Sequence, residues 1–184
     1  MYKTCLTTQS AQRQYEIEQA LLQMMLKRPY EDITVSELCD SLHLPRKAFY
    51  RYFSDKDGAL YALIDHTMER FFDYDPEKVQ KRGTAITDLE LAFVFWKNNK
   101  IVLDAIERNN LGGIFAQRAG DFAVREGHLP QQLKRLQPEA RELAMAFSIY
   151  GLMAMILQWH KQGFLLSPGE MAQLTMGLLS KSNK

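Results

Sequence analysis

The stretch from Leu143 to His160 contains no formally charged residue, although 24% of the chain is charged. Its apolar residues recur at intervals of three and four, which predicts a helix from Pro138 to Gln162. One apolar stripe consists of Leu143, Phe147, Tyr150, Ala154 and Leu157, and a second of Ala146, Ile149, Met153 and Ile156. A helix that is apolar on two sides must be buried on both. We therefore expect one face to pack on its own domain and the other on a second subunit.

This uncharged run also approaches the length of a membrane span, which requires about 20 apolar residues. Polar side chains at Ser148 and Gln158 interrupt the run, and the mean hydropathy of the whole chain is −0.30. These features favour a buried helix over a span, so we expect no contact with a membrane.

Another helix is expected directly after this one. Ser167 and Glu170 have the spacing of a capping box, and Pro168 suits the first helical position. Leu174 and Leu178 then lie on one apolar stripe. We predict that the subunit interface combines this helix with the second stripe of the preceding one. Its residues are Ala146, Ile149, Met153, Ile156, Leu174 and Leu178.

The whole chain is expected to be all-α. The apolar residues recur at helical spacing, and the strict alternation of a half-buried strand is absent. With 184 residues, the chain has room for one domain, or for a small module joined to a larger one. We predict about nine helices in two parts, with the polar segment 73–84 as the one plausible linker.

Cysteine content and the first residues bear on the compartment. Two cysteines are too few for a disulfide framework, and residues 1–14 have neither a basic start nor an apolar stretch like those of a signal peptide. We therefore expect a reducing, cytoplasmic environment.

Short helices joined by tight turns are expected in the first third of the chain. Apolar spacing predicts a helix over about 11–27, which Pro29 ends. Thr34 and Glu37 form a capping box for the next helix, whose apolar stripe puts Cys39 in the core rather than at a reactive surface. A further short helix can begin at Pro45.

This further helix has two unlike faces. Phe49 and Phe53 share one face, four residues apart. The opposite face carries Arg46, Lys47, Tyr50 and Arg51. Four cations stand against one anion from His43 to Lys56, although the net charge of the chain is only +1. Two short helices joined by a tight turn have the layout of a helix-turn-helix, whose second helix enters the DNA major groove. The alternative is that the cations form an ordinary solvated surface.

Two runs of sequence and one lysine in this segment match a known family. The runs are ITVSELC at 33–39 and LPRKAFYRYF at 44–53, and the lysine is Lys56. Over about residues 13–64, the chain resembles the N-terminal DNA-binding domain of the TetR family of transcriptional regulators. The resemblance implies a DNA-binding domain at 11–55 after a flexible tail at 1–10. It also implies a regulatory and dimerisation domain at 56–184, in which the helix 56–74 connects the two parts.

The family's residue roles carry over by position. The positions that meet base edges correspond to Arg46, Lys47 and Ala48, and Arg46 suits a bidentate contact with guanine. The positions that contact phosphates correspond to Thr34, Tyr50, Tyr52 and Lys56. The turn departs from the family pattern, since His43 replaces the usual glycine and Pro45 replaces a serine-like cap. Histidine adopts the left-handed backbone conformation at some cost.

The last two helices are similar to those of one branch of the family, often found in Gram-positive bacteria, with Tyr150-Gly151, Trp159 and Ser167-Pro168 as the shared residues. In the family, such helices form a four-helix bundle across a two-fold axis. The resemblance therefore implies a homodimer on a roughly palindromic double-stranded DNA operator. The family includes repressors and activators.

Small-molecule effectors are common in the family, bound among the middle helices. In this chain the only sequence hint of an apolar cavity there is a set of aromatic stripes, which suit an ordinary core as well. They contain Phe93, Trp96, Phe115 and Phe122. No ligand-binding residue is predicted.

Catalytic and metal-binding patterns are absent from the sequence. The four histidines are scattered without a cysteine or carboxylate at ligand spacing, and no glycine-rich phosphate loop or nucleophile motif occurs. We expect no enzyme activity, cofactor or metal. Two other classes remain open, namely a helical protein that docks another regulator without reading DNA, and a small enzyme on an unfamiliar bundle. DNA binding distinguishes all three.

Overall fold

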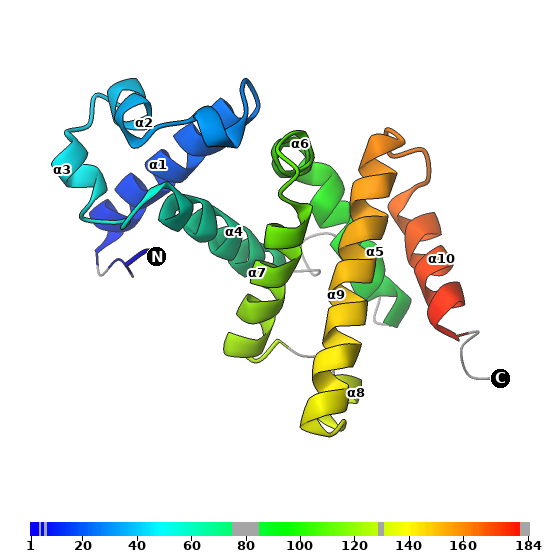
Figure 1. Ribbon diagram of the computed structural model, residues 1–184. Coiled ribbons are helices and arrows are strands. Elements are labelled where there is room, and N and C mark those ends of the chain that lie inside the picture. The colour runs from blue at the N-terminus through cyan, green and yellow to red at the C-terminus, as the bar shows by residue number, and fades with distance from the viewer. Residues whose placement is uncertain (4, 6, 75–84, 129–130, 181–184) are drawn as a thin grey trace.

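A computed structural model of the protein describes residues 1–3, 5, 7–74, 85–128 and 131–180. Within these ranges the regular structure is helical, apart from one isolated bridge between Tyr2 and Phe53. The fold is therefore all-α, as predicted (Figure 1). The expected linker at 73–84 lies outside the described residues beyond Tyr74.

The described residues form ten α-helices and one 3-10 turn, and two of the helices, α3 and α8, are single turns. The N-terminal elements are α1 (Thr8–Met25), η1 (Tyr30–Asp32), α2 (Val35–Ser41), α3 (Arg46–Phe49) and α4 (Lys56–Phe72). The C-terminal elements are α5 (Ala85–Asn98), α6 (Lys100–Arg108), α7 (Gly112–Arg125), α8 (Gln131–Lys134), α9 (Pro138–Lys161) and α10 (Pro168–Ser180). Figure 1 shows α1, α2 and α3 at one end of the molecule, with α4 leading from them into the bundle of later helices.

Local hydrogen bonds explain where several helices begin. Thr34 Oγ1 accepts from Glu37 N at 3.2 Å, and Glu37 Oε2 accepts from Thr34 N at 3.0 Å, so the predicted capping box of α2 is confirmed. The box before α10 is also confirmed, because Ser167 N donates to Glu170 Oε2 and Glu170 N donates to Ser167 Oγ.

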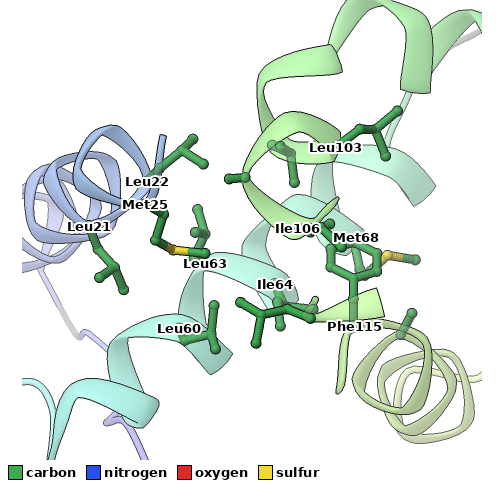
Figure 2. Packing of buried hydrophobic residues seen from close by; sticks show 14 of the residues in the cluster. Leu21, Leu22, Met25, Leu60, Leu63, Ile64, Met68, Leu103, Ile106 and Phe115 are labelled. Carbon is green, nitrogen blue, oxygen red and sulfur yellow. The ribbon is translucent and has the colours of Figure 1, made fainter. Parts of the chain in front are cut away.

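A single apolar core runs through both parts of the chain. Figure 2 shows three side chains of α1 facing the middle of α4, with side chains of α6 and α7 on its far side. The labelled residues are Leu21, Leu22, Met25, Leu60, Leu63, Ile64, Met68, Leu103, Ile106 and Phe115. Cys39 is buried in the same cluster, as predicted. Because α4 packs on both sides, a displacement of α4 must be felt by both parts.

One side of α9 is buried and the other is exposed, but the buried side is the one that we predicted for the subunit interface. Met153 and Ile156 are 6% and 1% exposed, whereas Leu143 and Phe147 are 74% and 72% exposed. The prediction is therefore wrong for Met153 and Ile156, which are buried inside their own chain.

Glycines in α7 give the physical reason for this orientation of α9. A Cβ atom on Gly120 would lie 3.1 Å from Ile149 Cδ1, and one on Gly112 would lie 3.1 Å from Leu157 Cδ1. The two helices therefore approach each other closely, and Ile149 packs on the chain's own α7 rather than on a partner. The α10 leucines of the predicted interface, Leu174 and Leu178, are 46% and 58% exposed.

Among the described helices, α9 alone is long and apolar enough to cross a membrane by length and composition, with a mean hydropathy of 1.4 in its most apolar window. One such helix is weak evidence for a span, because a helix of a soluble protein passes the same test. Here Trp159 and Ile156 anchor α9 in the core of the bundle.

The first residues of the chain lie across the end of α3 and the start of α4, and we call residues 1–3 and 5 the N-terminal strap. Lys3 N donates to Tyr52 O at 2.9 Å, and Ser54 N donates to Met1 O at 3.0 Å. A Cβ atom on Gly58 would lie 2.5 Å from Met1 O, so only glycine fits at that position of α4. These contacts differ from the flexible tail that we expected at 1–10, and α1 itself begins at Thr8. A segment of a few residues is too short to show a hydrophobic periodicity, so the sequence did not predict the contacts of the strap.

Candidate nucleic-acid interface

The turn between α2 and α3 uses the unusual residue that the sequence places there. His43 has φ of 49°, the left-handed conformation for which glycine is the ordinary choice. Leu44 N donates to Cys39 O at 2.8 Å and closes the turn. Pro45 then precedes α3 with φ of −60° and provides no side-chain cap. The chain therefore keeps a tight turn despite both departures.

Burial fixes which side of α3 faces the solvent. Phe49 and Phe53 are 0% and 1% exposed, and their ring centroids lie 5.2 Å apart beneath the helix. Arg46 and Lys47 are exposed, and Ala48 is half-buried between them and the core. The buried and exposed sides predicted for this segment are thus confirmed, but α3 itself ends at Phe49, whereas the predicted helix extended to Phe53. The exposed face has the cations and donors that base edges and phosphates require.

The first candidate phosphate contact stands at the start of α2. Thr34 is exposed, but its hydroxyl lies 2.7 Å from Glu37 Oε2. Arg28 Nη1 is 2.7 Å from the other oxygen of Glu37 and holds α2 against the end of α1. The Arg28 hydrogen bond, followed by those from Thr34, lowers the pKa of Glu37 to about 2, so this carboxylate stays charged. It fixes the position at which the first backbone N–H groups of α2 are presented.

Two tyrosines follow α3 with different exposures. Tyr50 is 45% exposed, and its ring meets the ring of Phe49 edge-on at 5.4 Å. Tyr52 is half-buried, and its carbonyl accepts the hydrogen bond from Lys3 in the strap. Packing therefore orients both rings, which limits the entropy that a phosphate contact through their hydroxyls would lose.

Lys56 has a structural role that the sequence did not reveal. Its Nζ donates to Tyr30 O at 2.6 Å and to Glu31 O at 3.2 Å, and lies 4.2 Å from the centre of the Tyr30 ring. Two of its three protons are thus used to cap η1, which leaves one for a phosphate. Sequence analysis placed Arg51 on the cationic face without giving it a DNA contact, and it did not select Lys3. Both residues are exposed beside α3.

An ionic cluster links this interface to the C-terminal helices. Asp65 of α4 is 1% exposed, and it accepts from Arg118 of α7 twice, at 2.7 and 2.8 Å. Arg125 Nη2 donates to it at 3.1 Å, and the Tyr2 hydroxyl of the strap at 2.7 Å. Burial, followed by the hydrogen bond to Asp65, raises the pKa of Tyr2, so this hydroxyl keeps its proton and acts as a donor. The cluster joins residues far apart in sequence, so no local pattern predicts it.

An apolar cavity of about 220 Å³ lies between α4, α7 and α9. Its lining includes Met68, Phe71 and Phe72 of α4, together with Trp96, Ala119 and Met153. The aromatic stripes of the middle helices therefore serve mostly as core, as one of the two interpretations held, and Trp96 alone of the four named aromatic residues lines the cavity.

Comparisons with known proteins agree with this geometry. The family model of bacterial regulatory proteins of the tetR family matches residues 17–63. A comparison with curated protein sequences found no match.

Solved structures share the fold over nearly the whole chain. The fatty acid degradation regulator FadR from Bacillus halodurans aligns with a TM-score of 0.61 at 14% identity, covering 91% of this chain and 94% of that one. FadR from Bacillus subtilis in complex with stearoyl-CoA gives 0.56 at 15% identity, covering 90% and 96%. The repressor AlkX from Dietzia sp. gives 0.55 at 16% identity, covering 92% and 94%. The helix-turn-helix with its exposed cations and the family match across α1 to α4 lead to one conclusion: the chain is a DNA-binding transcriptional regulator whose N-terminal domain is that of the TetR family.

Proposed function

We propose that the protein binds its operator in the cytoplasm as a homodimer, with α3 of each subunit in successive major grooves about 34 Å apart. Arg46, Lys47 and Ala48 contact base edges in this proposal, and Thr34, Tyr50, Tyr52 and Lys56 contact phosphates. The observation that carries it is the exposed cationic face of α3 above the buried pair Phe49 and Phe53. The alternative, a regulator that docks another protein without reading DNA, leaves that face without a use.

Exposed apolar side chains on α9 and α10 support the dimer. Leu143, Phe147 and Tyr150 of α9 and the two leucines of α10 are all 46% or more exposed in the single chain. Monomeric proteins rarely expose several large apolar side chains together on one face. Burial of these side chains against a partner would be favourable. We propose that this face, which we call the α9–α10 face, packs on its own copy across a two-fold axis. Ala146, also exposed, lies at its edge.

Arg46→Ala is expected to remove discrimination at one base pair of each half-site, worth about 1–3 kcal/mol, because a bidentate guanine contact is lost. Tyr50→Phe is the control, since loss of a phosphate hydrogen bond weakens binding to all sequences alike. The measurement is fluorescence anisotropy on the selected operator and its single-base variants, after selection of genomic fragments with the purified protein. An equal loss on specific and random DNA for Arg46→Ala would contradict the assigned role.

We further propose that an apolar small molecule occupies the cavity between α4, α7 and α9 and changes the position of α4. The stearoyl-CoA bound by a structurally similar FadR is consistent with an apolar ligand. Ligand pockets usually measure about 300–1,000 Å³. The cavity here is about 220 Å³, which favours a short acyl chain over a long one. Such a ligand can shift DNA binding only through its different affinity for the two positions of α4.

Ala119→Leu is expected to fill part of this cavity and to raise the acyl-CoA concentration needed to change operator affinity by roughly tenfold, an effect of about 1.4 kcal/mol. Ala119 is 5% exposed and lines the cavity, whereas exposed Ala140 is suited to the control change Ala140→Leu. Operator binding is measured in titrations with acyl-CoAs of increasing chain length. If no acyl-CoA changes operator affinity, or if both variants respond alike, the effector proposal fails while DNA binding stands.

A further inference from the structure

A second, more polar cavity lies where the N-terminal strap meets α1, α4 and α7. Its volume is about 470 Å³, and residues of all four elements line it, including Tyr2, Gln14, His66 and Phe122. It is separate from the apolar cavity, although His128 lines both. The ring of His128 stacks on that of Phe72, which lines the apolar cavity, with centroids 4.1 Å apart.

Gln14 is the first observation that points to a ligand. The residue is 2% exposed, and its Oε1 accepts a hydrogen bond from Cys5 Sγ in the strap. Its Nε2 is buried and has no hydrogen-bond partner among the described residues. A buried donor without an acceptor is unfavourable, so native proteins rarely keep one. An acceptor oxygen of a ligand in the cavity would satisfy it.

Charge is the second observation. Four carboxylates line the cavity, Asp65, Glu69, Asp73 and Glu126, against two permanent cations, Lys3 and Arg125. Arg125 already pairs with Asp65 and Glu126. Glu69 and Asp73 lie one turn apart on α4, are exposed, and make no ion pair with a described residue. The wall formed by the end of α4 and its C-cap Asp73 therefore has unbalanced negative charge, which suits a cationic group.

We propose that this cavity is a second ligand site, which takes a small organic amine that also carries a hydrogen-bond acceptor. The ammonium group lies at Glu69 and Asp73, and the acceptor oxygen faces Gln14 Nε2. Such a ligand touches the strap and α1 on one side and α7 on the other. It therefore stabilises the arrangement in which the helix-turn-helix is held against the C-terminal helices.

The test is isothermal titration of the full-length protein at fixed ionic strength with three probes of similar size. 4-Amino-1-butanol carries both groups, butylamine lacks the acceptor, and 1,4-butanediol lacks the amine. We expect aminobutanol to bind about tenfold more tightly than either of the other probes. This ratio of dissociation constants corresponds to about 1.4 kcal/mol of binding free energy. The absence of binding by aminobutanol in the millimolar range, or equal binding of aminobutanol and butanediol, would overturn the proposal.

Two variants locate the binding. The double change Glu69→Gln and Asp73→Asn is expected to weaken aminobutanol binding about tenfold or more. Its matched control, Asp121→Asn with Glu142→Gln, alters exposed carboxylates outside the cavity and leaves binding unchanged. Equal weakening by both double variants would show a general charge effect and overturn the site.

Gln14→Leu separates a ligand contact from a structural role. Because the unpartnered donor is removed, the free protein is expected to melt at a higher temperature, while the preference for aminobutanol over butylamine disappears. A lower melting temperature together with an unchanged preference would show that Gln14 serves only the fold.

Discussion

Phe147→Glu is expected to convert the protein into folded monomers that no longer bind the operator tightly. Phe147 is 72% exposed in the single chain, so a glutamate there costs the monomer little. In the proposed dimer, each lost phenylalanine removes about 1.5–3 kcal/mol of burial, and the two-fold axis doubles the loss. The dimer dissociation constant should therefore rise by at least about a hundredfold, even before the cost of burying two carboxylates is counted.

The measurement is sedimentation velocity over a range of protein concentrations, with operator binding measured in parallel. Ile101→Glu is the matched control, because Ile101 is another exposed large apolar residue, 38% exposed, on α6 and away from the α9–α10 face. A dimeric Phe147→Glu protein would refute the proposed interface. A monomer that still binds the operator as tightly would refute the need for the dimer instead.

Asp65→Asn is expected to lower the free energy of unfolding by about 3 kcal/mol, the lower end of the range for a broken buried ion pair. The lower end applies because Arg118 and Arg125 are 26% and 46% exposed, so water partly compensates them. For a chain of this length, that loss lowers the melting temperature by roughly 6–12 °C. Urea unfolding at one fixed protein concentration gives the free energy, since a dimer's stability depends on concentration.

The control for this change is Asp121→Asn, which removes an exposed carboxylate from α7. It should change stability by no more than about 0.5 kcal/mol. Because Tyr2 also bonds to Asp65, the Asp65→Asn variant should loosen the strap at the end of α3 as well. Faster hydrogen exchange at Lys3 N, the donor to Tyr52, would report that release. A loss of stability within 0.5 kcal/mol would show that the cluster is not a structural link.

Local signals in the sequence were enough to predict where several helices begin and which side of the α3 segment is buried. The capping boxes at Thr34 and Ser167 each involve groups three residues apart, so their effect can be read from a short window. The two faces of α3 follow from the four-residue spacing of Phe49 and Phe53. Leu174 and Leu178, predicted for the subunit interface, are exposed in the single chain, and the interface itself stays a prediction.

Contacts between distant residues explain what the sequence could not predict. Both stripes of α9 are apolar, and the choice between them depends on the close approach at Gly120, thirty or so residues away in α7. The Asp65 cluster draws on three separate segments, and Lys56 caps a turn formed far earlier in the chain. Hydrophobic periodicity contains no information about such pairings.

The shortness of α3 limits how much information one subunit can extract from DNA. Its four residues, Arg46–Phe49, rise by about 6 Å, less than two base-pair steps of about 3.4 Å each. Even if each subunit contacts three base pairs directly, a dimer contacts roughly six. A given sequence of six base pairs recurs about once in four thousand positions. A genome offers on the order of a million or more competing sites. The remaining specificity for the operator must therefore come from the distance between the two half-sites and from the deformability of the DNA between them. In the proposed dimer, the relative placement of the two subunits is thus part of how the operator is recognised.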